Sequence, residues 1–355
     1  MDKVAVSFRQ NSGIYTRNIG SVQTQSLTST TDYNMNNQRK HAGPSISGLI
    51  RITSLQTVAT GGMSDVYHGE WTENAKRGYE KLAVKFFRAE HIDAEKADAE
   101  RVRLLRETRA WEALNATSQL PAVSQSIRVE SNKWAGIHHP NILPFYGVCY
   151  GLDRFPQSHG MVSPWMDNGD IRAFLSNNPN THRGQLIYQV ACGLEYLHTK
   201  GIIHGDLRGC NILINDKGQA LISDFGRAKL AVDDEYTKQL LASAAWTAPE
   251  VLLYAGGGDV PVSESSDVWS LGMTTLEVFV GQNNLWANCL PAQIVVRLAR
   301  GIQPTRQEYP DVPQGYWQAL NGCFKSDPCE RPSSSGLRAR LQQLLNREAA
   351  SHRRS

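Results

Sequence analysis

The chain has 355 residues, a hydrophobic fraction of 41%, and 37 Lys and Arg residues against 34 Asp and Glu residues. This length predicts one large or two modest domains, and the apolar fraction is large enough for a sizeable core. The formal net charge of +3 is too balanced to indicate a nucleic-acid or membrane partner.

The six cysteines form no C-x-x-C pair and follow no regular spacing, which favours reduced thiols. No apolar run of the sequence approaches the ~18 residues that a membrane span needs, and the N-terminus has no apolar signal core. We therefore predict a soluble, cytoplasmic chain, with a nuclear location also compatible.

Both ends of the chain are polar. Residues 1–48 contain 21 Ser, Thr, Asn or Gln residues, so they cannot bury enough apolar surface to offset the entropy of ordering. We predict a disordered tail there, although its acid-poor start leaves a mitochondrial presequence open. Residues 347–355 are predicted to form a short basic tail.

The first folded elements are predicted to be strands. A strand, a glycine turn and a second strand fit residues 55–71, and a third strand fits 81–87. Residues 93–114 are rich in Ala, Glu, Arg and Leu and predict a helix. Residues 115–136 have no apolar stripe, and we predict an exposed, dispensable insert there, unless the segment is an unspliced intron of the gene model.

The rest of the chain is mainly helical in its periodicity, over residues 171–176, 183–199, 267–280, 291–300 and 335–347. Strands first and helices afterwards is the pattern of an α+β protein. We predict two lobes: a small β-rich lobe of about 52–162 with one long helix, and a larger, mainly helical lobe of about 167–346.

The glycine turn has the register of a phosphate-binding loop. In "ATGGMSDVYHG" the loop positions fall on Ala59, Gly61 and Ser64, and Gly62 and Met63 complete the turn. Glycine lets the backbone approach a phosphate closely, whereas Ala or Ser narrows that approach without closing it. By itself, such a turn is also typical of a simple hairpin.

A lysine follows at the spacing that a nucleotide site requires. Lys85 lies in the strand "LAVKFF", 19 residues after Val66. Alone it could be an ordinary edge charge. Together with the loop it fits the V-A-I-K motif, whose Lys contacts the α- and β-phosphates of ATP and a helix Glu.

The predicted helix offers three carboxylates for that pairing. Glu107 has Leu104 and Trp111 on the same helix face, which turns that face toward the strands. Glu100 and Glu112 are rivals with fewer apolar neighbours on their own side.

The segment "HGDLRGCNILIND" carries residues suited to phosphoryl transfer. Asp206 and Asn211 are five residues apart, so a carboxylate can orient a hydroxyl while an amide oxygen holds a metal. Asp224 ends an apolar strand in "ISDFGRAK", and with Asn211 it can hold the Mg²⁺ ions that bridge the phosphates. Gly205 stands where this loop usually has Arg.

Three further motifs, "AAWTAPE", "SDVWSLGM" and "CERPS", follow in order at compatible spacings. With them, the chain from about residue 52 to 346 resembles a eukaryotic protein kinase domain. "VSPWMDNGDI", "HPNILPFYGV" and "HGDLRGCNIL" are most similar to the tyrosine-kinase-like group as found in mushroom-forming fungi. The resemblance implies a protein substrate, and ATP and Mg²⁺ as cofactors.

The resemblance also implies roles for single residues. Asp206 is implied as the base for the substrate hydroxyl, and Lys85 as a phosphate ligand that pairs with Glu107. Arg208 is implied near the γ-phosphate. The implied metal ligands are Asn211 and Asp224. The implied nucleotide-binding residues are Val58, Ala59, Gly61, Gly62, Met63, Ser64, Val66, Ala83, Lys85, the gatekeeper Ser163, Met166 through its backbone, Asp170 at the ribose, and Leu213. Away from the nucleotide, Asp267 is implied to anchor the loop of Asp206, and Glu250 to pair with Arg331.

Two other functions compete with this interpretation. Small-molecule phosphotransferases also carry H-G-D in this loop, but they lack the A-P-E and D-V-W-S-L-G motifs that this chain has. An impaired kinase fold that acts as a nucleotide-binding scaffold would explain Ala59 and Ser64 in the loop, and the insert. None of the Lys, base or metal-binding positions is lost, so we expect an active protein kinase.

Two details bear on control and specificity. Gly205 removes the cation that, in the family, holds a phosphorylated activation segment, so we expect activity without such phosphorylation. Ser243 occupies a position where Ser/Thr kinases carry a Thr, whereas "WTAPE" and Arg208 are common in tyrosine kinases. We expect Ser/Thr specificity, with dual specificity open.

Overall fold

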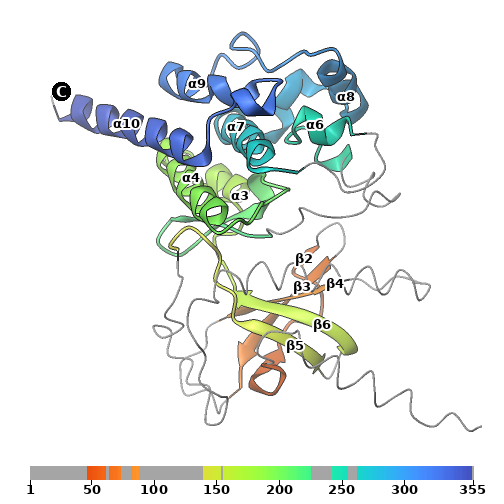
Figure 1. Cartoon of the computed structure of the whole chain (residues 1–355). Helices are drawn as coiled ribbons and strands as arrows, with labels where there is room; N and C mark the ends of the chain where they lie inside the picture. Colours follow the sequence, from red (N-terminus) through yellow and green to blue (C-terminus); the bar gives the residue numbers. More distant parts are fainter. Residues whose placement is uncertain are drawn as a thin grey trace, which may run out of the picture. The chain divides into compact units, whose positions relative to one another are not determined.

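The computed structural model describes residues 46–60, 64–72, 81–87, 139–152, 155–224, 241–254 and 262–353. The predicted helix with Glu107, the predicted insert, and the loop residues Gly61, Gly62 and Met63 lie outside these ranges. Within them, strands come first and helices follow (Figure 1). The fold is α+β with a β-rich lobe and a helical lobe, as predicted.

The first lobe is built on an antiparallel sheet. Its strands lie in the order β1-β3-β4-β6-β5, and β2 pairs with the start of β3, at Asp65 and Val66, which β1 leaves unpaired. Their bounds are β1 Ile50–Ile52, β2 Ala59–Thr60, β3 Ser64–Trp71, β4 Leu82–Phe87, β5 Gly147–Leu152 and β6 Phe155–Pro164. The segment "LAVKFF" forms β4, at the centre of the sheet.

The alternation of β4 separates a core face from a second face. Leu82, Val84 and Phe86 are buried in the small-lobe core together with Val162 of β6. Successive side chains of a strand point to opposite faces. The intervening residues of β4 therefore point away from this core, on the side where Met161 packs into the core of the helical lobe.

The helical lobe surrounds one central helix. Helix α7 is apolar on nearly all sides and is buried over most of its length, which is typical of a helix in the middle of a lobe. The elements of this lobe are α3 Ile171–Asn177, α4 Arg183–Thr199, β7 Ile212–Ile214, β8 Ala220–Ile222, α6 Pro249–Leu252, α7 Glu264–Val280, α8 Pro291–Ala299, α9 Gln314–Leu320 and α10 Ser334–His352. No helix in the described ranges is long and apolar enough to cross a membrane.

Both predicted tail boundaries need correction. Ile46 and Ile50 are 2% and 4% exposed and belong to the small-lobe core, so the fold already includes residues 46–48. At the other end, α10 continues to residue 352, and the hydroxyl of Tyr316 donates to Glu348 at 2.9 Å. These last turns are rich in Ala, Arg and Glu, which form helices well but leave no apolar stripe for a periodicity argument to detect.

The predicted pair between Glu250 and Arg331 is confirmed. Both terminal nitrogens of Arg331 donate to the Glu250 carboxylate, each at 2.7 Å, and the side chains are 0% and 20% exposed. The guanidinium also donates to the Ser265 carbonyl at 3.0 Å and lies over the Trp269 ring. The pair therefore fastens α6 to the segment before α10 and to α7.

We expect Arg331→Ala to lower the stability of the helical lobe strongly. The change leaves a largely buried carboxylate without its partner, which typically costs roughly 3–5 kcal/mol. Thermal denaturation should show a Tm lower by about 10 °C. Lys325→Ala is the matched control, because Lys325 pairs with Glu330 at 4.0 Å in an exposed position. A shift no larger than that of the control would contradict the role of the pair.

Candidate active site

Four predicted nucleotide-site residues share the second face of the sheet. Val66 of β3 is the cross-strand partner of Lys85, and Ala83 is the partner of Ser163 in β6. Partners in an antiparallel pair point to the same face, as do residues two apart on one strand. The N–H of Val58 donates to the Val66 carbonyl at 2.8 Å, which brings the start of the glycine loop beside them. Lys85 places its ammonium group on this face.

The described ends of the glycine loop flank this face. Ala59 pairs with Val66, and Ser64 lies two residues before Val66 on the same face of β3. Ser64 is 6% exposed, so its side chain is packed against its neighbours and does not lie in solvent. Both positions lie at the end of the sheet that carries Val66 and Lys85.

The segment after β6 connects the sheet to the helical lobe. The Met166 carbonyl accepts the Gly169 N–H at 2.9 Å, and the Gly169 carbonyl accepts the Ile214 N–H at 2.9 Å. Asp170 and Leu213 form an isolated antiparallel bridge. The residues predicted to bind adenine and ribose through the segment after β6 therefore lie next to Leu213, which is predicted to pack against the adenine ring.

The carboxylate of Asp170 has partners of its own. Its Oδ1 accepts the backbone N–H groups of Arg172 and Ala173 at 2.8 and 3.1 Å, which caps α3. Its Oδ2 accepts from the Arg172 guanidinium at 2.7 Å. Burial alone would raise the pKa of the Asp170 carboxyl, but these hydrogen bonds outweigh it and lower that pKa. The sequence predicted a ribose ligand here and did not foresee this pairing.

An ion pair joins the sheet to the loop after β8. Lys85 Nζ lies 2.6 Å from Asp224 Oδ1. Asp224 has a φ of 56°, in the left-handed region that Asp tolerates better than most residues. Residues 139 apart in sequence are thus in direct contact. The other predicted partner of Lys85, Glu107, lies outside the described residues.

Asp206 and Asn211 are also in contact. The Asn211 amide nitrogen donates to the Asp206 carbonyl at 2.7 Å and to its carboxylate at 3.2 Å. Arg208 Nε lies 3.6 Å from the same carboxylate. Both Asp206 and Asn211 are buried, so the side chains are held in defined positions.

The donors that are present fit a magnesium ion. Because the Asn211 nitrogen donates to Asp206, its amide oxygen, which also accepts from the Cys210 thiol at 3.4 Å, is the Asn211 atom that can contact a cation, and Asp224 adds carboxylate oxygen. Hard oxygen donors suit Mg²⁺, which usually takes further oxygens from water and phosphate. In the described parts of the chain, no cluster of three or more His, Cys, Asp or Glu could hold a metal by itself. The fit therefore requires oxygens from a bound nucleotide.

Asp267 holds the loop that carries these residues, as the resemblance implied. Its carboxylate accepts the His204 N–H at 2.7 Å and the Gly205 N–H at 2.9 Å. Gly205 has a φ of 78°, a conformation that glycine adopts without the strain a side chain would add. The residue that replaces the usual Arg therefore fits the backbone of the turn.

Two supporting groups were not found from the sequence. His198 donates from Nε2 to Asp267 at 2.9 Å, and its Nδ1 lies 2.9 Å from the Ser334 hydroxyl at the start of α10. Glu277 accepts the Gly209 N–H and the Trp246 indole N–H, both at 2.8 Å. Burial raises the pKa of the Glu277 carboxyl. The sequence signal that could have identified Glu277 was a carboxylate in the mainly apolar second half of helix α7.

His204 links the loop to the residue before Asp224. Its Nδ1 accepts the Asp206 N–H at 3.1 Å, so the proton is on Nε2, which donates to the Ser223 carbonyl at 3.0 Å. The side chain is fully buried, and burial lowers the pKa of the imidazole below its usual value of 6.5. The folded protein therefore keeps this histidine neutral.

We expect stability to fall as the pH drops below about 6.5. Below this pH the unfolded chain protonates His204 and the folded chain does not. The free energy of unfolding therefore keeps its highest value above this pH and decreases below it. Tm measured between about pH 8 and pH 5.5 should decrease in the parent. His204→Phe should show a smaller decrease, although the lowered pKa of His139 leaves a residual one. An equally steep decrease in the variant would contradict the assignment.

Comparison with known proteins agrees with this geometry. A family model described as protein tyrosine and serine/threonine kinase matches residues 113–341. Tyrosine-protein kinase Src64B of Drosophila melanogaster is 32% identical over 205 residues, which cover 55% of this chain and 35% of that protein. Mitogen-activated protein kinase kinase kinase 5 of Arabidopsis thaliana is 30% identical over 61% of this chain and 29% of its own length.

Dual specificity testis-specific protein kinase 2 of Rattus norvegicus is 32% identical, with 59% of this chain and 36% of that protein covered. The chain thus aligns with only about a third of the length of these relatives. The family model covers well over half of the present sequence. The chain belongs to the protein tyrosine and serine/threonine kinase family.

Proposed function

We propose that this chain is an active protein kinase that transfers the γ-phosphate of ATP to Ser and Thr hydroxyls of proteins. One observation carries the proposal. The loop of Asp206 and Asn211 is held beside the segment of Asp224, which in turn contacts Lys85 of the sheet. The groups needed for phosphoryl transfer are thus gathered from three separate stretches of the chain.

The residues divide the work as follows. Lys85 binds the α- and β-phosphates, and Asn211 and Asp224 hold Mg²⁺, which neutralises charge on the phosphates. Asp206 orients the acceptor hydroxyl and takes its proton as the new P–O bond forms and the bond to ADP breaks. Arg208, next to Asp206, stabilises charge on the transferred group.

Two kinds of observation support the assignment of Ser and Thr as the acceptor residues. Ser243 lies at the position that favours Ser/Thr kinases, and two of the relatives are by name a kinase kinase kinase and a dual specificity kinase. The tyrosine kinase among the relatives keeps transfer to Tyr as an outcome to be measured. The motifs quoted above support our proposal that the chain lies nearest the tyrosine-kinase-like group. We also propose that a polar tail precedes the kinase domain and that residues 115–136 are an insert.

We expect Asp206→Asn to lower phosphate transfer by about 10²–10⁴-fold, because a positioned base typically contributes that factor. Transfer from radiolabelled ATP to a generic protein substrate, followed by phosphoamino-acid analysis, measures the rate and the acceptor type. Asp216→Asn is the matched control, since Asp216 is exposed in the turn after β7.

ATP affinity should change little in the Asp206→Asn variant, which separates loss of chemistry from loss of the nucleotide site. Equal transfer rates for the two Asn variants would refute the assigned base. Binding of Mg-ATP by the parent without any transfer would instead identify a nucleotide-binding scaffold.

We also expect activity that does not depend on phosphorylation of the segment before Glu250. Gly205 offers no side-chain cation to a phosphate, and its N–H is bound to Asp267. Phosphatase-treated enzyme should keep most of its rate, and Tyr236→Phe combined with Thr237→Ala should behave like the parent. A loss of about tenfold or more would mean that another cation takes the place of the missing Arg.

A further inference from the structure

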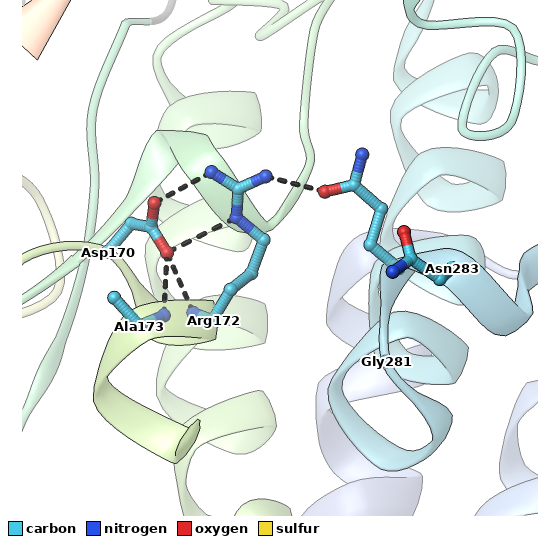
Figure 2. A pocket seen from close by; sticks show the side chains of 6 residues that line it. Asp170, Arg172, Ala173, Gly281 and Asn283 are labelled. Atoms are coloured by element: carbon cyan, nitrogen blue, oxygen red, sulfur yellow. Dashed lines mark hydrogen bonds and ion pairs between the residues drawn. The ribbon is translucent and has the colours of Figure 1, made fainter. Parts of the chain in front are cut away.

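A cavity of about 430 Å³ lies between the start of α3 and the turn that follows α7 (Figure 2). Its volume is within the range of roughly 300–1,000 Å³ that is usual for ligand pockets. The lining residues are Asp170, Arg172, Ala173, Gly281, Gln282 and Asn283. Gly281 adopts a φ of 85° and adds no side chain, which leaves this side of the cavity open.

The two charged groups of the lining neutralise each other. Arg172 donates to the Asp170 carboxylate from Nε at 3.2 Å and from a terminal nitrogen at 2.7 Å (Figure 2). Its other terminal nitrogen donates to the Gln282 side-chain oxygen at 2.6 Å. An incoming cation would find a carboxylate that is already paired with Arg172, and an incoming anion would find a guanidinium whose charge is already balanced by Asp170.

Neutral hydrogen-bonding groups are what remains. Gln282 accepts from Arg172 through its oxygen, which directs its amide NH₂ away from that contact. Asn283 adds a second amide in an exposed position. Amides offer both donors and acceptors, so they match another amide or a hydroxyl better than a charged group.

The cavity adjoins the loop of the predicted base. A methyl group added at Gly209 would lie only 2.8 Å from the Cγ of Arg172, so the Arg172 stem packs directly on that residue. Gly209 is three residues after Asp206 in the loop. An extended chain advances roughly 3.3–3.6 Å per residue, so a peptide with its hydroxyl at Asp206 can reach the cavity within a few residues.

We propose that this cavity is a subsite for the protein substrate that selects a neutral hydrogen-bonding side chain such as Gln or Asn. Arg172 determines this specificity, because it pairs with the one carboxylate that could otherwise attract Lys or Arg. The inference rests on the proposed function, since the peptide must present its hydroxyl to Asp206.

Peptide arrays test the subsite. Each peptide has a Ser acceptor, and Gln, Arg or Glu replaces one flanking residue at a time. Two signals are measured for every peptide: binding of labelled protein in the presence of a non-hydrolysable ATP analogue, and phosphate incorporation from ATP. We expect the parent to prefer Gln over both charged residues at one flanking position.

Two variants should reverse this preference. Gln282→Glu adds a carboxylate at an exposed position, and Arg172→Ala frees the carboxylate of Asp170. Each should favour Arg over Gln at the same position by about three- to fivefold, the size of one partly exposed ion pair. Gln342→Glu is the matched control, because Gln342 is an amide of α10 bonded to Asn346, and it should keep the parent's pattern.

The outcomes separate the two proposals. Variants that transfer phosphate with the parent's selectivity would overturn the subsite alone. The expected binding pattern without phosphate incorporation would overturn the proposed function and leave the subsite in place. A parent that prefers Arg or Glu, or the failure of all four proteins to bind any peptide, would overturn the subsite. Gln282→Glu keeps the test decisive even if Arg172→Ala does not fold.

Discussion

The carboxylate of Asp267 is the group on which the geometry of the site depends. It is 1% exposed and accepts two backbone N–H groups of the loop and the imidazole N–H of His198. A buried charge is costly unless its hydrogen-bonding capacity is used, and here each donor supplies that compensation. The loop therefore has one backbone conformation in which this carboxylate is satisfied. Asp267 lies on helix α7, which is buried over most of its length. The carboxylate therefore anchors the loop to the core of the helical lobe.

Two further buried groups fix the same loop from other sides. His204 bonds to the Asp206 N–H and to the Ser223 carbonyl, which couples the loop to the segment that follows β8 and carries Asp224. Glu277 receives the N–H of Gly209 on the far side of Asp206. Polar groups held in this way before a ligand arrives need little reorganisation during a reaction. The arrangement is what a phosphotransferase requires of its acceptor site.

The opposite wall of the site is built by a sheet rather than by buried polar groups. The alternation of β4 points Lys85 away from the small-lobe core, and the contact with Asp224 is the polar link from this strand to the acceptor side. The Asp170 carboxylate, near the edge of the site, is committed to Arg172 and to the backbone of α3. The charge that a ligand meets in this site therefore depends on the ion pairs Lys85–Asp224 and Asp170–Arg172 as well as on the charged residues of the sequence motifs.

The sequence by itself predicted the local elements and supplied the residues that we propose for the site. The apolar run "LAVKFF" indicated β4, helical periodicity indicated α4 over residues 183–199, and fixed spacings indicated Asp206, Asn211 and Asp224. Such signals are local, because a strand, a helix or a loop motif is encoded within a few turns of chain. The pairing of Glu250 with Arg331 followed from the resemblance, and the structure confirmed it.

Tertiary structure alone decided which side chains satisfy the buried polar groups. His198 meets Asp267 across 69 residues and Ser334 across 136, and no local pattern marks either contact. From the sequence, the Arg172 side chain could have pointed to solvent. In the folded protein it bonds to the Asp170 carboxylate and to Gln282, which lies in the turn after α7. The physical reason is the same in each case. A hydrogen bond depends on distance and angle in space, and the chain fixes these only when the helices and turns of the lobe have packed together.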